Sequence, residues 1–203
     1  MQLEFWVDPV CPWCWLTSRW ALDVADHRDL DVQWRSISLK VKNQTEPDSK
    51  WYEPVAYTHS LLRVMESLRA AEGNEAVGRF YTTAGTHIHH NEDRSQTADA
   101  LLAEAGLDRS HAAAFDDESW DTVIEAAMNE GLALTGDDVG TPILAFANGE
   151  GTRVGFFGPV ISRRLPVDQS LQLWDGMVAM ADTDSFWELK RTRAEDPDFT
   201  PVG

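Results

Sequence analysis

Apolar residues at the start of the chain are spaced as in a strand, a helix and a second strand. They alternate over residues 3–7, which is typical of a half-buried strand, and then recur with helical spacing at Leu16, Trp20 and Val24. A second strand is predicted over residues 31–39, with a bulge where the alternation changes phase. Strand, helix and strand in this order form a βαβ unit, whose two strands are expected to run parallel.

The pattern is helical almost throughout residues 54–134, after a polar loop over residues 40–50. Gly73 ends the first predicted helix, Gly106 ends a shorter one as a C-cap, and Asp108 caps a brief segment. The apolar stripes of these helices are typical of packing faces rather than of a cofactor site. We interpret this block as an all-helical insertion between the second and third strands.

Alternation returns on both sides of a glycine-containing turn at residues 148–151. Residues 143–146 and 154–156 are therefore predicted to form a β-hairpin. A closing helix is predicted to begin near Asp168, and a short helical segment near residues 186–191 follows it. This order of elements predicts an α/β fold with an inserted helical subdomain.

The two cysteines of the chain stand at the predicted junction between the first strand and the first helix. Pro12 fits the first helical position, where its missing N–H costs nothing, and Cys11 then falls at the N-cap. The unpaired N–H groups there and the positive end of the helix dipole favour a thiolate, so we predict Cys11 as the nucleophile. Cys14 lies one turn further on the same face, close enough to form a disulfide with it.

Three other uses of this cysteine spacing fit less well. Half a zinc site would need two more ligands, and only His87, His89 and His90 are clustered in the sequence, so no metal is expected. A structural disulfide would close almost no loop and would stabilise the fold little. Two buried, inert cysteines remain an alternative, although Pro12 and Trp13 between them at such a junction favour redox chemistry.

Composition and charge limit the partners and the location that are expected for this chemistry. A formal net charge of −17 argues against a nucleic acid or an anionic membrane as partner, because both need a basic patch. Apolar residues make up 43% of the chain, with nine Trp, which is ample for a core. No basic segment followed by an apolar run opens the sequence, so neither a secretion signal nor a transmembrane helix is expected. The expected location is the cytoplasm, where a CxxC motif is more often catalytic than structural.

Thr141 and Pro142 directly precede the third predicted strand. A proline is tolerated at the start of a strand, where its missing donor need not break the ladder. The bond before it could also be cis, as at tight turns that are kept for a purpose. The residues alone leave both alternatives open.

Together these features resemble the DsbA-like branch of the thioredoxin fold: CxxC at the first helix of a βαβ unit, a helical insertion, and Thr-Pro opening a hairpin that a helix closes. The resemblance implies that Cys11 is the attacking thiol and Cys14 the resolving thiol. It also implies that the bond between Thr141 and Pro142 is cis, and that its backbone faces the cysteines and pairs with incoming substrates.

The same resemblance divides the chain into domains. Residues 1–50 and 136–193 are expected to form the two parts of the thioredoxin-like domain, and residues 51–135 the helical insertion subdomain. Residues 194–203 are expected to be a loose acidic tail.

The sequence is further similar to the mycothiol-dependent nitroreductases of actinobacteria. The segments that carry this similarity are residues 5–15, 17–20, 88–89, 138–142, 156–160, 173–175 and 188–193. The resemblance implies cytosolic dithiol chemistry in which a low-molecular-weight thiol, mycothiol, acts as co-substrate and regenerates the reduced enzyme. It also implies nitroaromatic reduction with no tightly bound cofactor. Small thiols, disulfides and nitroaromatics are the expected partners, and a homodimer is compatible with the sequence.

Four further residues are weaker candidates for the site. Trp13 would shield the cysteines or stack on an aromatic substrate, with simple packing as an equal alternative. Asn43, just after the second strand, would contact the bound thiol, although a turn residue is the simpler interpretation. His89 and Asn91 would line the cleft from the insertion, and a solvated surface histidine is the alternative for His89.

Two other functions stay open at this point. A kappa-type thiol S-transferase or isomerase shares the fold, but such proteins typically carry Ser where this chain has Cys11. A non-catalytic module would use the disulfide only to switch its affinity for a client that the insertion holds. Both cysteines favour a thiol–disulfide oxidoreductase that acts as a reductant.

Overall fold

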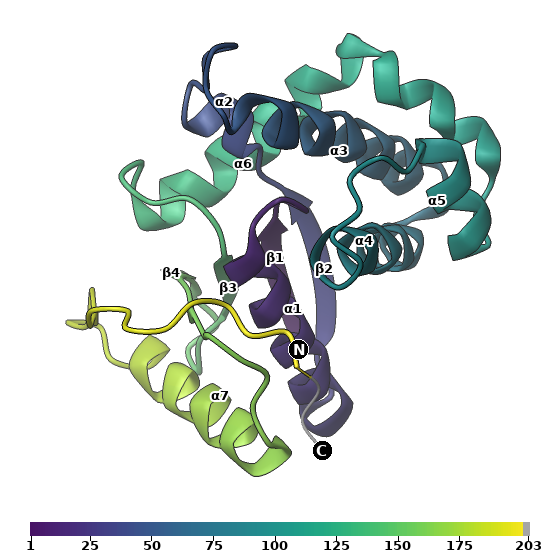
Figure 1. Ribbon diagram of the computed structural model, residues 1–203. Coiled ribbons are helices and arrows are strands. Elements are labelled where there is room, and N and C mark those ends of the chain that lie inside the picture. Colours follow the sequence, from purple (N-terminus) through teal and green to yellow (C-terminus); the bar gives the residue numbers. More distant parts are fainter. Residues whose placement is uncertain (201–203) are drawn as a thin grey trace.

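The computed structural model describes residues 1–200 and contains a mixed four-stranded sheet in the order β2-β1-β3-β4 (Figure 1). The strands are β1 (Gln2–Val7), β2 (Asp31–Ser36), β3 (Ile143–Ala147) and β4 (Arg153–Phe157). β1 and β2 run parallel and are joined by α1 (Pro12–Arg28), whereas β3 is antiparallel to both β1 and β4. With α7 (Val167–Ala181) following the β3–β4 hairpin, the predicted thioredoxin-like arrangement is confirmed.

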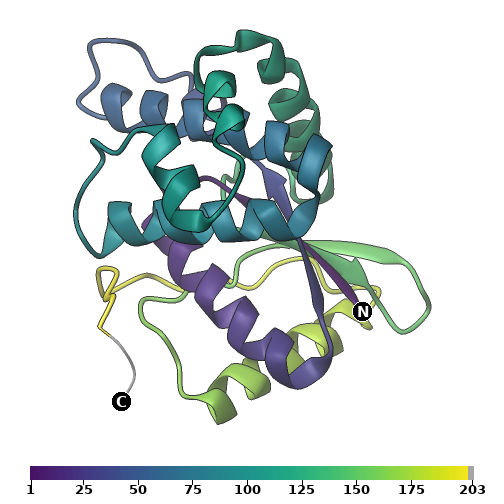
Figure 2. The same cartoon turned by 90° about the vertical axis from the view of Figure 1, so that its right-hand side faces the viewer.

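The predicted all-helical insertion lies between β2 and β3. Its elements are α2 (Leu39–Lys42), α3 (Tyr52–Glu72), α4 (Asn74–His89), α5 (Ala98–Ala105), the 3-10 helices η1 (Arg109–Asp116) and η2 (Glu118–Trp120), and α6 (Asp121–Thr135). Gly73 and Gly106 follow α3 and α5 with positive φ, and Asp108 caps η1, as the sequence predicts. Figures 1 and 2 show α3, α4 and α5 grouped together, apart from α7.

The alternation of residues along β1 separates two cores. Leu3 and Phe5 face the larger one, which α1, α7 and the insertion share. Trp6 points to the opposite face, where α6 covers it and its Nε1 donates to the carbonyl oxygen of Ala127 at 2.6 Å. Because both faces of β1 are buried, its last residues hold the segment that follows, which carries both cysteines.

The second strand is shorter than predicted. β2 ends at Ser36, and Ser38 instead caps α2, its hydroxyl accepting from the N–H of Val41 at 3.3 Å. Residues 37–39 therefore leave the sheet, and the change of alternation marks the end of the strand rather than a bulge. The loop expected over residues 40–50 accordingly begins with a short helical turn.

The helical segment predicted near residues 186–191 is wrong. That stretch is irregular, and Trp187 and Leu189 are 85% and 81% exposed. A helix this short is unstable in isolation, and these apolar side chains have no surface of the protein to pack against. The expected loose tail is also incorrect for residues 194–200, which form specific contacts described below. Residues 201–203 of that prediction lie outside the described residues.

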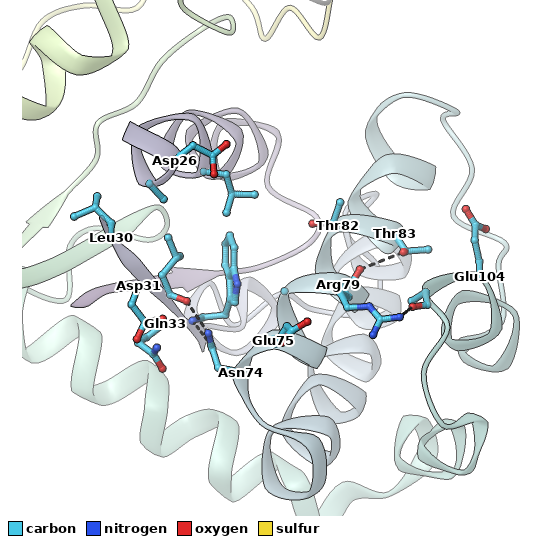
Figure 3. Close-up of a pocket in the computed structure, with 16 residues that line it drawn as sticks. Asp26, Leu30, Asp31, Gln33, Asn74, Glu75, Arg79, Thr82, Thr83 and Glu104 are labelled. Atoms are coloured by element: carbon cyan, nitrogen blue, oxygen red, sulfur yellow. Dashed lines mark hydrogen bonds between the residues drawn. The ribbon is translucent and has the colours of Figure 1, made fainter. Parts of the chain in front are cut away.

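β2 is an edge strand, and a groove of about 830 Å³ runs beside it between α1 and α4 (Figure 3). The side chain of Asn74 there takes the place of a neighbouring strand. Its Oδ1 accepts from the N–H of Trp34 at 2.8 Å, and its Nδ2 donates to the carbonyl oxygen of Val32 at 2.6 Å. Neither cysteine lines this groove, so it is separate from the CxxC motif. Within residues 1–200, no helix combines the length and apolar character needed to cross a bilayer.

Candidate active site

The CxxC motif sits where the sequence predicts, between the end of β1 and the start of α1. Pro12 is the first helical residue, and Cys11 is the N-cap, in an extended backbone conformation. The Sγ of Cys11 accepts from the N–H of Cys14 at 3.4 Å. Both thiols are free; Cys11 is 7% exposed and Cys14 is fully buried. Cys11 is thus the sulfur nearer to the surface.

Thr141 brings a distant part of the chain to both sulfurs. The bond between Thr141 and Pro142 is cis, and the Thr141 carbonyl oxygen lies 3.7 Å from the Sγ of Cys11. The Thr141 hydroxyl oxygen lies 3.2 Å from the Sγ of Cys14 and 2.6 Å from the carbonyl oxygen of Trp6. One residue at the start of β3 therefore contacts both thiols and the strand that precedes them.

The thiolate predicted for Cys11 is not favoured in this conformation. Burial raises the pKa of the Cys11 thiol to about 11, although the N–H groups of Cys14 and Trp13 act in the opposite direction. The N–H groups at the start of the helix therefore lower the pKa of Cys11, as predicted, but the burial of the thiol raises it by more. Burial also raises the pKa of Cys14, and the nearby Cys11 raises it further. Both sulfurs are consequently protonated at neutral pH.

Asp8 is a functional candidate that the sequence pattern does not single out. Its carboxylate is fully buried and accepts from the N–H of Val10 at 3.0 Å and from that of Leu39 at 2.7 Å. Burial raises the pKa of Asp8 to about 6, so the group is largely ionised at pH 8. Its negative charge contributes to the raised pKa of Cys11. The partner Leu39 is 31 residues away, which local turn preferences cannot reveal.

We expect Asp8→Asn to lower the pKa of Cys11, because it removes a buried negative charge that opposes the thiolate. At pH 8, where Asp8 is ionised, alkylation of Cys11 by iodoacetamide should become about threefold to tenfold faster, since one pKa unit corresponds to a tenfold change. The measurement is a pH series of alkylation rates followed by intact mass. Asp26→Asn, at the far end of α1, is the matched control and should leave the profile unchanged. An unchanged profile for Asp8→Asn would contradict this account.

The insertion reaches the site through α4. The hydroxyl of Tyr81 lies 3.8 Å from the Sγ of Cys14, and the Trp15 ring stacks on His89 with centroids 5.7 Å apart. The Nε2 of His89 donates to the carbonyl oxygen of Pro9 at 2.8 Å. Burial lowers the pKa of His89 to about 4, so it is neutral, and the solvated alternative for this residue is wrong. Tyr81 was missed because its apolar helical spacing indicated only packing.

The two predicted asparagines are not brought to the cysteines. Asn91 is exposed, and its Nδ2 lies 3.5 Å from the Nδ1 of His87. Asn43 is exposed as well, and it ends α2 with its N–H donating to the carbonyl oxygen of Leu39. Over residues 1–200, no hydrogen bond joins either side chain to Cys11 or Cys14.

Trp13 is half-buried and meets a residue from the C-terminal segment. The Cζ of Arg193 lies 5.0 Å from the centroid of the Trp13 ring, which is within the range of a cation–π contact. The sequence marked residues 188–193 as a motif without assigning them to the site. In the part of the chain that the structure describes, no three His, Cys, Asp or Glu side chains are grouped as metal ligands.

Comparisons with known proteins agree on fold and family. Rv2286c of Mycobacterium tuberculosis, an uncharacterized protein, is 27% identical over 197 residues, covering 95% of this chain and 82% of that protein. A candidate protein disulfide isomerase from Nitrosomonas europaea has a TM-score of 0.61 at 18% identity, covering 88% of this chain and 97% of that one. The cytosolic disulfide reductase DsbM of Pseudomonas aeruginosa has a TM-score of 0.57 at 16% identity, covering 89% and 100%.

These structures share the DsbA-like form of the thioredoxin fold. A sequence model of the Rv2466c-like family, described as mycothiol-dependent nitroreductase Rv2466c, matches residues 10–191. That match spans both cysteines, the whole helical insertion and the Thr141–Pro142 bond. The chain therefore belongs to the Rv2466c-like family of mycothiol-dependent nitroreductases.

Proposed function

We propose that the protein is a thiol–disulfide oxidoreductase of the cytoplasm that acts as a reductant, with Cys11 as the attacking thiol and Cys14 as the resolving thiol. The observation that carries the proposal is the contact of Thr141 with both sulfurs across from the start of α1. Cys11 is the sulfur nearer to solvent, so an incoming disulfide reaches it first. The backbone of Thr141 and Pro142 then offers a hydrogen-bonding edge to the substrate.

The reaction has two exchange steps. The Sγ of Cys11, after losing its proton, attacks one sulfur of the substrate disulfide, and the other sulfur leaves as a thiolate. Cys14 then loses its proton and attacks the Sγ of Cys11. This forms the Cys11–Cys14 disulfide and releases the second substrate thiol. Two electrons pass from the protein to the substrate.

The raised pKa of Cys11 supports the direction of electron flow. A strong oxidant of this fold class is one whose reduced form is stabilised, as by a very acidic cysteine. Here burial opposes the thiolate, so the reduced pair lacks that stabilisation and gives up its electrons more readily. We therefore expect the pair to be reducing.

The family match supports mycothiol as the thiol that regenerates the dithiol. One mycothiol would form a mixed disulfide with the oxidised protein, and a second would release mycothiol disulfide and restore both thiols. A nitroaromatic would take the same two electrons with two protons, giving a nitroso compound and water. Trp13, half-buried within the motif, would stack on such a ring, and the hydrogen bond from His89 to the carbonyl oxygen of Pro9 holds the segment before Cys11.

Two measurements test this proposal. The equilibrium potential of the Cys11–Cys14 pair should lie closer to the value of thioredoxin, about −270 mV, than to that of DsbA, about −120 mV. Turnover of a small disulfide should be at least about tenfold faster with mycothiol than with glutathione at equal concentration, because only a matched thiol gains binding energy. A DsbA-like potential would reverse the proposed direction, and equal rates would remove mycothiol from it.

A further inference from the structure

The C-terminal segment after α7 is anchored to the protein although it contains neither helix nor strand. We call residues 193–200 the strap. The carboxylate of Glu195 accepts from the hydroxyl of Ser162 at 2.9 Å and pairs with the Arg163 guanidinium at 2.5 Å. The N–H of Asp198 donates to the carbonyl oxygen of Ser162 at 2.7 Å. These contacts join the strap to the segment between β4 and α7.

An aromatic contact fixes the far end of the strap to the insertion. The ring of Phe199 packs on His89 and on His90, with centroids 5.4 and 5.7 Å apart. His90 in turn accepts a hydrogen bond from the Nε1 of Trp15 at 3.1 Å. Figures 1 and 2 show the C-terminal segment, in yellow, running from α7 back to the side of α1. The strap therefore contacts the segment between β4 and α7 as well as α4 of the insertion, next to the CxxC motif.

Arg193 begins the strap directly over the motif. Its guanidinium lies over the ring of Trp13, the residue that directly precedes Cys14. The distance from the Cζ of Arg193 to the ring centroid is 5.0 Å. Its positive charge lowers the pKa of Cys11, against the larger effect of burial and the opposing charge of Asp8. The side chain is exposed, so its charge is partly screened by solvent.

Most other titratable groups around Cys11 are negative or neutral, and the cation Arg19 on α1 lies over the Trp15 ring and interacts with Cys14. Asp8, at the end of β1, is negative, and Cys14 on α1 is protonated because burial raises its pKa. On α4, burial keeps His89 neutral by lowering its pKa, and it keeps Tyr81 protonated by raising its pKa. Arg193 is a cation whose charge lowers the pKa of the Cys11 thiol itself.

We propose that Arg193 is a positioning residue that stabilises the thiolate of Cys11, and that the strap exists in part to hold it over the motif. This inference rests on the proposed role of Cys11 as the attacking thiol. It extends that role by naming a charge that partly offsets the effect of burial on this sulfur. It also assigns Glu195 and Phe199 an indirect function, because they fix the strap on either side of the site.

The first test removes the charge. Arg193→Gln should raise the pKa of Cys11 and slow its alkylation by iodoacetamide at pH 8 by about twofold to fivefold, because an exposed, solvent-screened charge shifts a pKa by less than one unit. Arg193→Lys should restore much of the rate, because it keeps the charge. Arg191→Gln, on the same exposed segment, is the matched control and should leave the profile in place. A profile for Arg193→Gln that matches the wild type overturns the proposal.

The second test removes an anchor without changing any charge. Phe199→Ala should slow alkylation in the same direction as Arg193→Gln, and the double variant should be no slower than Arg193→Gln alone. Independent, additive effects would show that the strap does not act through Arg193. Both tests use the reduced protein and need no substrate turnover. Undiminished turnover by Cys11→Ser would therefore contradict the proposed function, whereas these pH profiles test only the role of Arg193.

Discussion

Replacing Cys11 by serine is expected to abolish disulfide reduction, with turnover falling by at least about a thousandfold. A serine hydroxyl is not ionised at neutral pH, and it cannot form the mixed disulfide on which the first exchange step depends. The fold should be retained, because serine is nearly isosteric with cysteine and is a preferred N-cap residue. Measured loss would therefore reflect chemistry rather than unfolding, and a thermal melt of the variant checks this.

Cys14→Ser is the matched partner of that variant. It keeps the attacking thiol but removes the resolving one, so a mixed disulfide between Cys11 and the substrate should accumulate. Intact mass spectrometry before and after reduction would show the adduct. Undiminished turnover by Cys11→Ser would exclude the proposed nucleophile.

The same pair of variants separates the other functions. Conjugation of an electrophile by Cys11→Ser with added thiol would indicate a kappa-type transferase. Redox-dependent binding of a client, with a catalytic rate no better than that of free dithiothreitol, would indicate a binding module instead. The buried Thr141 contact with both sulfurs favours exchange chemistry over either.

Much of the fold follows from local periodicity. The alternation at residues 3–7 and the glycine turn at residues 148–151 predict β1 and the hairpin, since successive side chains of a strand point to opposite faces of the sheet. The predictions fail where the periodic pattern does not decide the structure. Ser38 caps a helical turn and ends β2 early, and the apolar Trp187 has no surface to cover. Periodicity alone cannot report whether a neighbouring surface exists.

Some residues of the candidate site can likewise be predicted from the local sequence, and others cannot. The spacing of Cys11 and Cys14 is local, and the Thr-Pro pair stands beside a recognisable hairpin, so both are visible in the sequence. Asp8 and Arg193 become relevant only because the chain folds them against the motif. The sign of the Cys11 pKa shift depends on the burial of its sulfur in the folded chain, which the local sequence does not show.

The close approach of α4 to α1 leads to a second large effect, on stability. A Cβ added at Gly85 would lie 2.2 Å from the Cζ3 of Trp15, far inside van der Waals contact. Trp15 is buried, stacks on His89 and donates from its Nε1 to His90, so a shift of its ring would disrupt these contacts. Glycine is therefore required here by the ring of the neighbouring helix, and not by its own backbone conformation.

Gly85→Ala should destabilise the protein by about 2 kcal/mol or more, because overpacking of a rigid core outweighs the gain of about 1 kcal/mol that alanine brings to a helix. Gly176→Ala is the matched control: it lies within α7 and a Cβ there meets no atom within 4 Å, so only the helical gain remains. Urea unfolding midpoints should move in opposite directions. If both midpoints rise alike, α4 and α1 do not pack as closely as this contact between Gly85 and Trp15 requires.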